Sequence, residues 1–136
     1  MSEEPRVLVE ISSSAPNPLD VIKLLRSMCS DCGAVTVYLG VVKPFSSCGS
    51  RVKGIEVSAD PSAAEELRRA CLEIARSCGC RALYVWHREG FAESGAELAV
   101  IGAAAMTRHQ VLECVRRAVD TVKSLGAIRR REITLE

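Results

Sequence analysis

The chain has 136 residues, of which 48% are hydrophobic and 26% are charged, and its formal net charge is +1. This length and balance are typical of one globular domain and exclude a disordered chain. The small net charge argues against wholesale binding to nucleic acid, and no apolar run approaches the roughly 20 residues of a membrane-spanning helix. The N-terminus lacks the apolar segment of a secretory signal, so we expect a cytoplasmic protein.

The first half of the chain alternates between strand and helix patterns. Apolar residues at every second position predict a strand over 6–11. Pro18 is suited to the first turn of a helix, which we expect to end near Gly33. Runs of β-branched and apolar residues then predict strands over 34–42 and 52–59.

A second helix and two further strands follow. Asp60 precedes a proline, as an N-cap residue often does, so we expect the helix to begin there and to stop at Gly79. Its apolar residues recur at steps of three and four, which predicts one buried face. Apolar runs predict strands over 81–87 and 97–105, with a turn between them.

The last predicted elements are a helix and a closing strand. Thr107 and Gln110 have the spacing of a capping box, and Gly126 is the expected end of that helix. A loosely alternating segment predicts a strand over 128–135. Consecutive strands joined by short loops favour hairpins, so the sequence indicates an α+β fold, one domain over 1–136, with a largely antiparallel sheet and three helices on one side of it.

The cysteines allow three interpretations. Cys29 and Cys32 form a CxxC motif, and Cys78 and Cys80 lie far downstream with one residue between them. The four thiolates together are a conceivable zinc site, the CxxC pair is a conceivable disulfide, and we favour a third interpretation, reduced and buried small apolar residues. The total of seven is odd, so at least one thiol must be free or intermolecular.

The compartment bears on the choice between thiols and a disulfide. Most cytosolic thiols stay reduced, with the cytosol of hyperthermophiles as an exception. Asn17 and Gln110 are the only side-chain amides, which is typical of thermophiles. The excess of Arg over Lys fits a thermophile or a GC-rich genome equally well.

Basic residues near the third helix are the strongest chemical signal. Arg108 lies in its first turn, Lys123 lies near its end, and three arginines follow at 129–131. Such residues can complement the helix dipole or protect an edge strand, and they can equally bind a phosphate or carboxylate. The two histidines, His87 and His109, are more typical of a hydrogen-bonded structural residue and a surface residue than of catalytic bases.

Several segments then resemble motifs of the MoaE family, the catalytic (large) subunits of molybdopterin synthase, in the same order along nearly the whole chain. They are 33–43 (GAVTVYLGVVK), 52–57 (VKGIEV) followed by 60–61 (DP), 84–90 (YVWHREG) and 123–132 (KSLGAIRRRE). The resemblance implies an α/β hammerhead-type fold, a homodimer, and docking of a small ubiquitin-like sulfur carrier. The carrier's C-terminal Gly-Gly thiocarboxylate would supply sulfur to a cyclic pyranopterin monophosphate, completing molybdopterin in molybdenum cofactor biosynthesis.

The resemblance also implies a set of site residues. Lys123 matches the family's key lysine, and Lys43, Arg108 and Arg130 match its substrate-binding basic positions. Thr107 stands where the family has histidine, Lys43 where it has arginine, and Arg130 where it has lysine. Lys123 is therefore the expected catalytic amine, the other three cations are expected to hold the anionic substrate, and no metal or cofactor is expected.

Three functions from different classes remain open at this point. The first is a sulfurtransferase, the molybdopterin synthase large subunit. The second is a catalytically degenerate relative that keeps the dimer and acts as a binding or scaffold protein. The third is a cysteine-based metal or redox module. For the first, we expect Lys43, Arg108, Lys123 and Arg130 to converge in space, within one chain or across a dimer.

Overall fold

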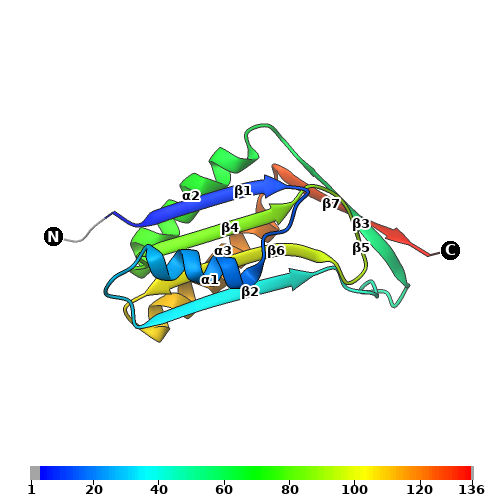
Figure 1. Ribbon diagram of the computed structural model, residues 1–136. Helices are drawn as coiled ribbons and strands as arrows, with labels where there is room; N and C mark the ends of the chain where they lie inside the picture. The colour runs from blue at the N-terminus through cyan, green and yellow to red at the C-terminus, as the bar shows by residue number, and fades with distance from the viewer. Residues whose placement is uncertain (1–3, 136) are drawn as a thin grey trace.

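The computed structural model describes residues 4–135, in which three helices and seven strands are found (Figure 1). In chain order they are β1 (Arg6–Ser12), α1 (Pro18–Ser27), β2 (Ala34–Val41), β3 (Val52–Ala59), α2 (Ala63–Cys78), β4 (Ala82–Arg88), β5 (Gly90–Glu93), β6 (Glu97–Ala105), α3 (Arg108–Ser124) and β7 (Ile128–Thr134). The predicted α+β class and the largely antiparallel pairing are confirmed. None of these helices combines the length and apolarity needed to cross a membrane.

The strands form two sheets, where the sequence analysis expected one. The first has the order β1-β4-β6-β2, in which only β1 and β4 run parallel, and the second has the antiparallel order β5-β3-β7. The second sheet lies at one end of the first (Figure 1). The short strand β5 is not predicted from the sequence. It exists because Gly90, at a φ of 94°, turns the chain out of the first sheet and into pairing with β3.

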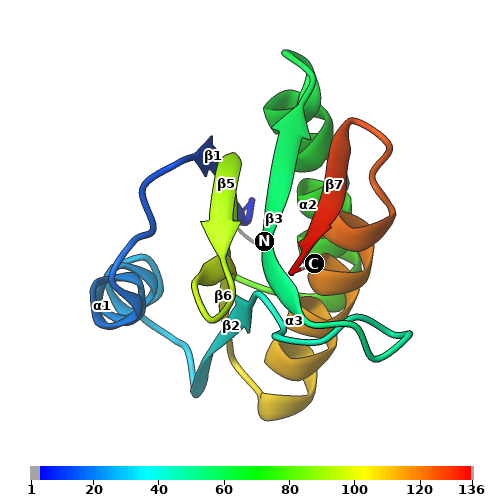
Figure 2. The same cartoon turned by 90° about the vertical axis from the view of Figure 1, so that its right-hand side faces the viewer.

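The central strands of the first sheet are apolar on both faces. Along β4, Leu83 and Val85 face a core shared with α2 and α3, whereas Tyr84 and Trp86 face a core shared with α1. The expectation that all helices lie on one side is therefore wrong, because α1 covers the opposite face (Figure 2). The physical reason is that a strand buried on both faces needs a helix on each.

Half of the helix ends follow the predicted local sequence rules. Thr107 and Gln110 form the predicted capping box, in which the Gln110 amide donates to the Thr107 hydroxyl at 3.3 Å and the Thr107 amide donates to the Gln110 side chain at 3.1 Å. Gly79 ends α2 in the left-handed conformation at a φ of 73°. The assignment of Asp60 as N-cap is wrong. Ser62 is the N-cap, and the Asp60 carboxylate pairs with Arg129 of β7 at 2.8 Å.

The first and third helices end slightly earlier than expected. α1 ends at Ser27, so the segment that leads to Gly33 is a loop. α3 ends at Ser124 with an extended C-cap, so Gly126 does not stop it through a left-handed conformation. In the loop before β2, the backbone of Gly33 comes close to the end of β6, where its amide donates a hydrogen bond to the carbonyl of Ala105 at 3.0 Å.

Gly33 provides a test of this close approach. A Cβ added there would overlap the carbonyl oxygen of Met106. Because the Cβ is fixed to one backbone segment and the oxygen belongs to another, neither atom can rotate away. We therefore expect Gly33→Ala to lower the free energy of unfolding by about 1–3 kcal/mol, measured by urea denaturation. Gly126→Ala is the matched control, because no atom lies within 4 Å of its added Cβ. Equal midpoints for the two variants would contradict the packing described here.

Candidate functional site

A pocket lies where the first sheet meets the second. Its volume is about 350 Å³, and five segments line it: β2 with the loop after it, the end of β4, the first half of β6, the last turns of α3, and β7. Apolar side chains form most of the wall, and a small number of polar groups converge on it. This combination is typical of a site for a small ligand. The lining residues are Tyr38, Leu39, Gly40, Val41, Lys43, His87, Leu98, Ala99, Ile101, Val119, Val122, Lys123 and Arg130.

Three of the four predicted site residues meet in this pocket. Lys43 follows β2, Lys123 lies in the last turn of α3, and Arg130 lies on β7. Lys43 and Lys123 are exposed, and Arg130 is half-buried. Within residues 4–135, no ion pair joins any of them to a carboxylate. Three cations without protein counter-charges beside an apolar wall are suited to an anionic ligand.

Arg108 is not part of the pocket within one chain. It is the first residue of α3 and is exposed, whereas Lys123 lies 15 residues further along the same helix. At a rise of 1.5 Å per residue, the two positions are roughly 22 Å apart along the helix axis. Only another copy of the chain can therefore bring Arg108 to this pocket.

His87 is a pocket residue whose role the sequence pattern did not reveal. Its predicted structural, hydrogen-bonded character is confirmed, since it is 1% exposed and makes two hydrogen bonds. Its Nδ1 lies 2.8 Å from the carbonyl of Arg88, and its Nε2 lies 3.0 Å from Nη2 of Arg130. The available signal was the alternation in β4, which places His87 on the same face as Leu83 and Val85.

Electrostatics keep His87 neutral. Burial is the main cause that lowers the pKa of its imidazole to about 4, and the positive charge of Arg130 acts in the same direction. The hydrogen bond to the Arg88 carbonyl opposes this shift but does not reverse it. At neutral pH the ring is therefore uncharged and has one lone pair to accept a hydrogen bond.

Arg130 is also held by the end of α3. Its Nη2 donates to the carbonyl of Val122 at 3.1 Å, which satisfies one of the carbonyls that the last turn of a helix leaves without a partner. Burial lowers the pKa of the Arg130 guanidinium, which nevertheless stays charged at neutral pH. The guanidinium is thus a fixed cation rather than a mobile surface charge.

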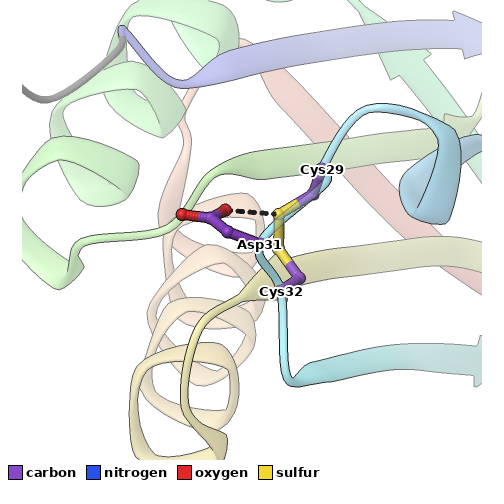
Figure 3. A group of neighbouring side chains, drawn as sticks. All are labelled: Cys29, Asp31 and Cys32. Atoms are coloured by element: carbon purple, nitrogen blue, oxygen red, sulfur yellow. Dashed lines mark hydrogen bonds between the residues drawn. A yellow bond between two sulfur atoms is a disulfide. The ribbon is translucent and has the colours of Figure 1, made fainter.

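The cysteines form a different arrangement from the one we favoured. Cys29 and Cys32 are joined in a disulfide beside Asp31, so their interpretation as reduced residues is wrong (Figure 3). Cys78 and Cys80 are free, and the four-thiolate zinc site is not formed. Among the buried thiols, Cys71 illustrates the environment, because burial raises its pKa to about 12 and favours the uncharged thiol. The metal half of the third hypothesis, a cysteine-based metal or redox module, therefore loses its proposed ligand set, whereas its redox half stays a hypothesis.

The two-sheet α+β fold places the chain in a structural class whose solved members include a molybdopterin synthase. The crystal structure of molybdopterin synthase from Staphylococcus aureus has a TM-score of 0.79 at 18% identity, covering 100% of this chain and 95% of that chain. The complex of subunits 1 and 2 of molybdopterin-converting factor from Helicobacter pylori contains a chain with a TM-score of 0.71 at 14% identity, covering 94% of this chain and 84% of that one.

Sequence comparisons define the family. The model of the MoaE protein matches residues 14–125, so the chain belongs to the MoaE family. The molybdopterin synthase catalytic subunit of Rattus norvegicus is 28% identical over 132 residues, which are 96% of this chain and 64% of that protein. The corresponding subunit of Drosophila willistoni is 30% identical over 128 residues, which are 92% of this chain and 33% of that protein. The chain thus spans less than two thirds of the length of these relatives.

Proposed function

We propose that this protein is the catalytic subunit of a molybdopterin synthase and transfers sulfur from a thiocarboxylated carrier protein to cyclic pyranopterin monophosphate. The observation that carries the proposal is the meeting of Lys43, Lys123 and Arg130 in one pocket with apolar walls. Membership of the MoaE family and the names of its relatives support the same activity.

The pocket suits both anionic reactants of this transfer. The phosphate of the pterin substrate and the thiocarboxylate of the carrier each need cationic donors, which Lys43 and Arg130 supply. The pterin ring system is flat and largely apolar at its faces, and the apolar wall that includes Tyr38 and Ile101 offers a surface for it.

Lys123 has a separate role in the proposal. Transfer from an acyl thiocarboxylate benefits from an amine that takes the acyl group or moves protons, and a guanidinium cannot do this near neutral pH. Lys123 is exposed in the single chain, so it is accessible to a carrier tail that enters the pocket.

The carrier is proposed to dock at the pocket entrance. A C-terminal Gly-Gly tail has no side chains, so it can extend into a narrow site. Leu39 and Val41 line the pocket and are 44% and 48% exposed, which leaves apolar surface where the body of a carrier would rest. The complex of subunits 1 and 2 from Helicobacter pylori supports such a partner.

Reconstitution is the direct test of this function. Purified protein, thiocarboxylated carrier and cyclic pyranopterin monophosphate are expected to yield the dithiolene product, assayed after conversion to a fluorescent derivative. The same carrier with an ordinary C-terminal carboxylate is the control and should yield none. Binding of the carrier without product, by a folded protein, would instead support the scaffold alternative.

We further propose that a homodimer completes the site, with Arg108 of one copy reaching the pocket of the other. Arg108 is exposed at the end of α3 distant from Lys123, and β2 is an outer strand whose Leu39 and Val41 are exposed. A two-fold dimer of standard size would bury on the order of 1,200 Å² or more. Light scattering at micromolar concentration should give the mass of a dimer, and a monomer would contradict this proposal.

Mixing an impaired variant with an inactive one tests the shared site. Arg108→Ala is expected to lower kcat/KM by about 5- to 150-fold, the equivalent of 1–3 kcal/mol for a charge-assisted hydrogen bond. Lys123→Ala is expected to be inactive. After unfolding and refolding together, half of the dimers carry one copy of each variant, and one of their two sites is intact. Activity should return to about a quarter of the wild-type value. Absence of any recovery would show that Arg108 acts within its own chain or not at all.

A further inference from the structure

We propose that His87 is a positioning residue for Arg130: its buried Nε2 accepts a hydrogen bond from Nη2 and thereby aims the remaining guanidinium donors into the pocket. The inference deepens the proposed function and rests on it only for a kinetic readout. Among residues 4–135, His87 is the only polar or charged side chain that is fully buried. A buried polar group of this kind needs a defined set of partners.

The two contacts of the imidazole determine where its proton lies. The carbonyl of Arg88 can only accept a hydrogen bond, so Nδ1, 2.8 Å away, must carry the proton. The guanidinium of Arg130 can only donate, so Nε2, 3.0 Å away, must be the acceptor. Both partners require the same neutral tautomer, which agrees with the lowered pKa of the ring.

The charges around the pocket all oppose a second proton on His87. Arg130 faces it from β7, Lys123 lines the same pocket from α3, and Lys43 lines it from the loop after β2. Arg88, the next residue on β4, faces the other side of the sheet, where its guanidinium lies over the Trp86 ring and pairs with Glu97. A protonated imidazole would turn a donor toward the donor of Arg130, so the hydrogen bond between them exists only for the neutral ring.

This hydrogen bond decides which part of Arg130 is available. Nη2 carries two protons, of which one is directed to Nε2 of His87 and the other to the carbonyl of Val122. The three remaining N–H groups, on Nη1 and Nε, have no hydrogen-bond partner among residues 4–135. Two anchor points on different elements hold the guanidinium plane, so those three donors are presented to a ligand in a fixed direction.

Nitrogen NMR tests the tautomer without any activity assay. The chain has two histidines, so ¹⁵N-histidine labelling gives two rings, and His109→Gln identifies the signals of the exposed one. At pH 7 we expect the His87 ring to be protonated at Nδ1 and unprotonated at Nε2. Arg130→Met should shift the Nε2 resonance and leave Nδ1 bonded. A ring protonated at Nε2, or an Nε2 signal unaffected by Arg130→Met, would overturn the proposal whether or not the protein is a synthase.

Steady-state kinetics test the consequence for the ligand. His87→Leu should raise KM for the pterin monophosphate about tenfold with little change in kcat, and His87→Gln, which keeps an acceptor oxygen, should restore most of the loss. In an Arg130→Met background, His87→Leu should change KM no further. If the effects of His87→Leu and Arg130→Met on KM instead multiply, the two residues act independently, and His87 merely fills space. If the wild-type protein makes no product, the proposed function fails, and the NMR result alone decides the role of His87.

Discussion

Lys123→Ala is expected to slow sulfur transfer by at least about 100-fold while leaving the fold and carrier docking nearly unchanged. Arg130 and Lys43 supply fixed or strongly hydrated charge to the pocket, so their loss should weaken binding, but neither is assigned as the acyl-accepting amine. Single-turnover formation of the dithiolene product measures the rate, and circular dichroism and calorimetric titration with the carrier measure the other two properties.

Lys123→Arg separates charge from amine chemistry. It keeps the positive charge in the last turn of α3 but removes a group that can lose its proton, so it should be nearly as slow as Lys123→Ala. Lys23→Ala is a suitable control, because Lys23 is exposed on α1, which covers the opposite face of the sheet. Near-normal product formation by Lys123→Arg would show that charge alone suffices, and the amine role would have to be withdrawn.

The second large effect is a loss of stability in mild acid caused by His87. In the folded protein burial lowers its pKa to about 4, whereas the unfolded chain has a pKa near 6.5. Between these values the unfolded state binds more protons than the folded state, so the free energy of unfolding falls as the pH decreases from about 6.5 to 4. The full loss, reached below pH 4, is on the order of 3 kcal/mol.

Urea denaturation at a series of pH values measures this loss. His87→Gln cannot titrate, so the stability difference between wild type and variant should change with pH in this window and stay constant above pH 7. The carboxylates of Asp31 and Asp60, whose pKa values are lowered by hydrogen bonds from Arg81 and Arg129, titrate in both proteins and cancel in the comparison. Parallel stability curves for the two proteins would mean that His87 is not buried as a neutral ring.

The two histidine predictions and the Lys123 prediction address separate properties of one pocket. Lys123 concerns the chemical step, the His87 hydrogen bond concerns the direction of Arg130, and the His87 pKa concerns the energetic cost of burying the ring. Because protonation of His87 would break its bond to Arg130, and the folded protein takes up this proton only near pH 4, acid should weaken substrate binding at the lower end of the pH range in which it weakens the fold.

Local sequence rules were sufficient for elements whose free energy depends on neighbouring residues. Pro18 at the start of α1, the Thr107 capping box and Gly79 at the end of α2 are each determined by a few adjacent side chains and backbone angles, and the sequence predicts all three. The apolar runs of the major strands were equally readable. Resemblance to the MoaE family then identified a set of four basic residues, Lys43, Arg108, Lys123 and Arg130. Within one chain all of them except Arg108 meet in the pocket, and nothing in their spacing shows this.

Tertiary structure decided the features that depend on contacts between distant residues. The face that α1 covers and the division into two sheets depend on which apolar surfaces remain to be covered. The N-cap of α2 is Ser62 and not Asp60, because the Asp60 carboxylate pairs with Arg129. The contact between His87 and Arg130 spans 43 positions and two sheets. Local preferences are worth about 1 kcal/mol per residue, whereas sheet pairing and core burial are settled only by the whole fold, and the geometry of the pocket depends on them.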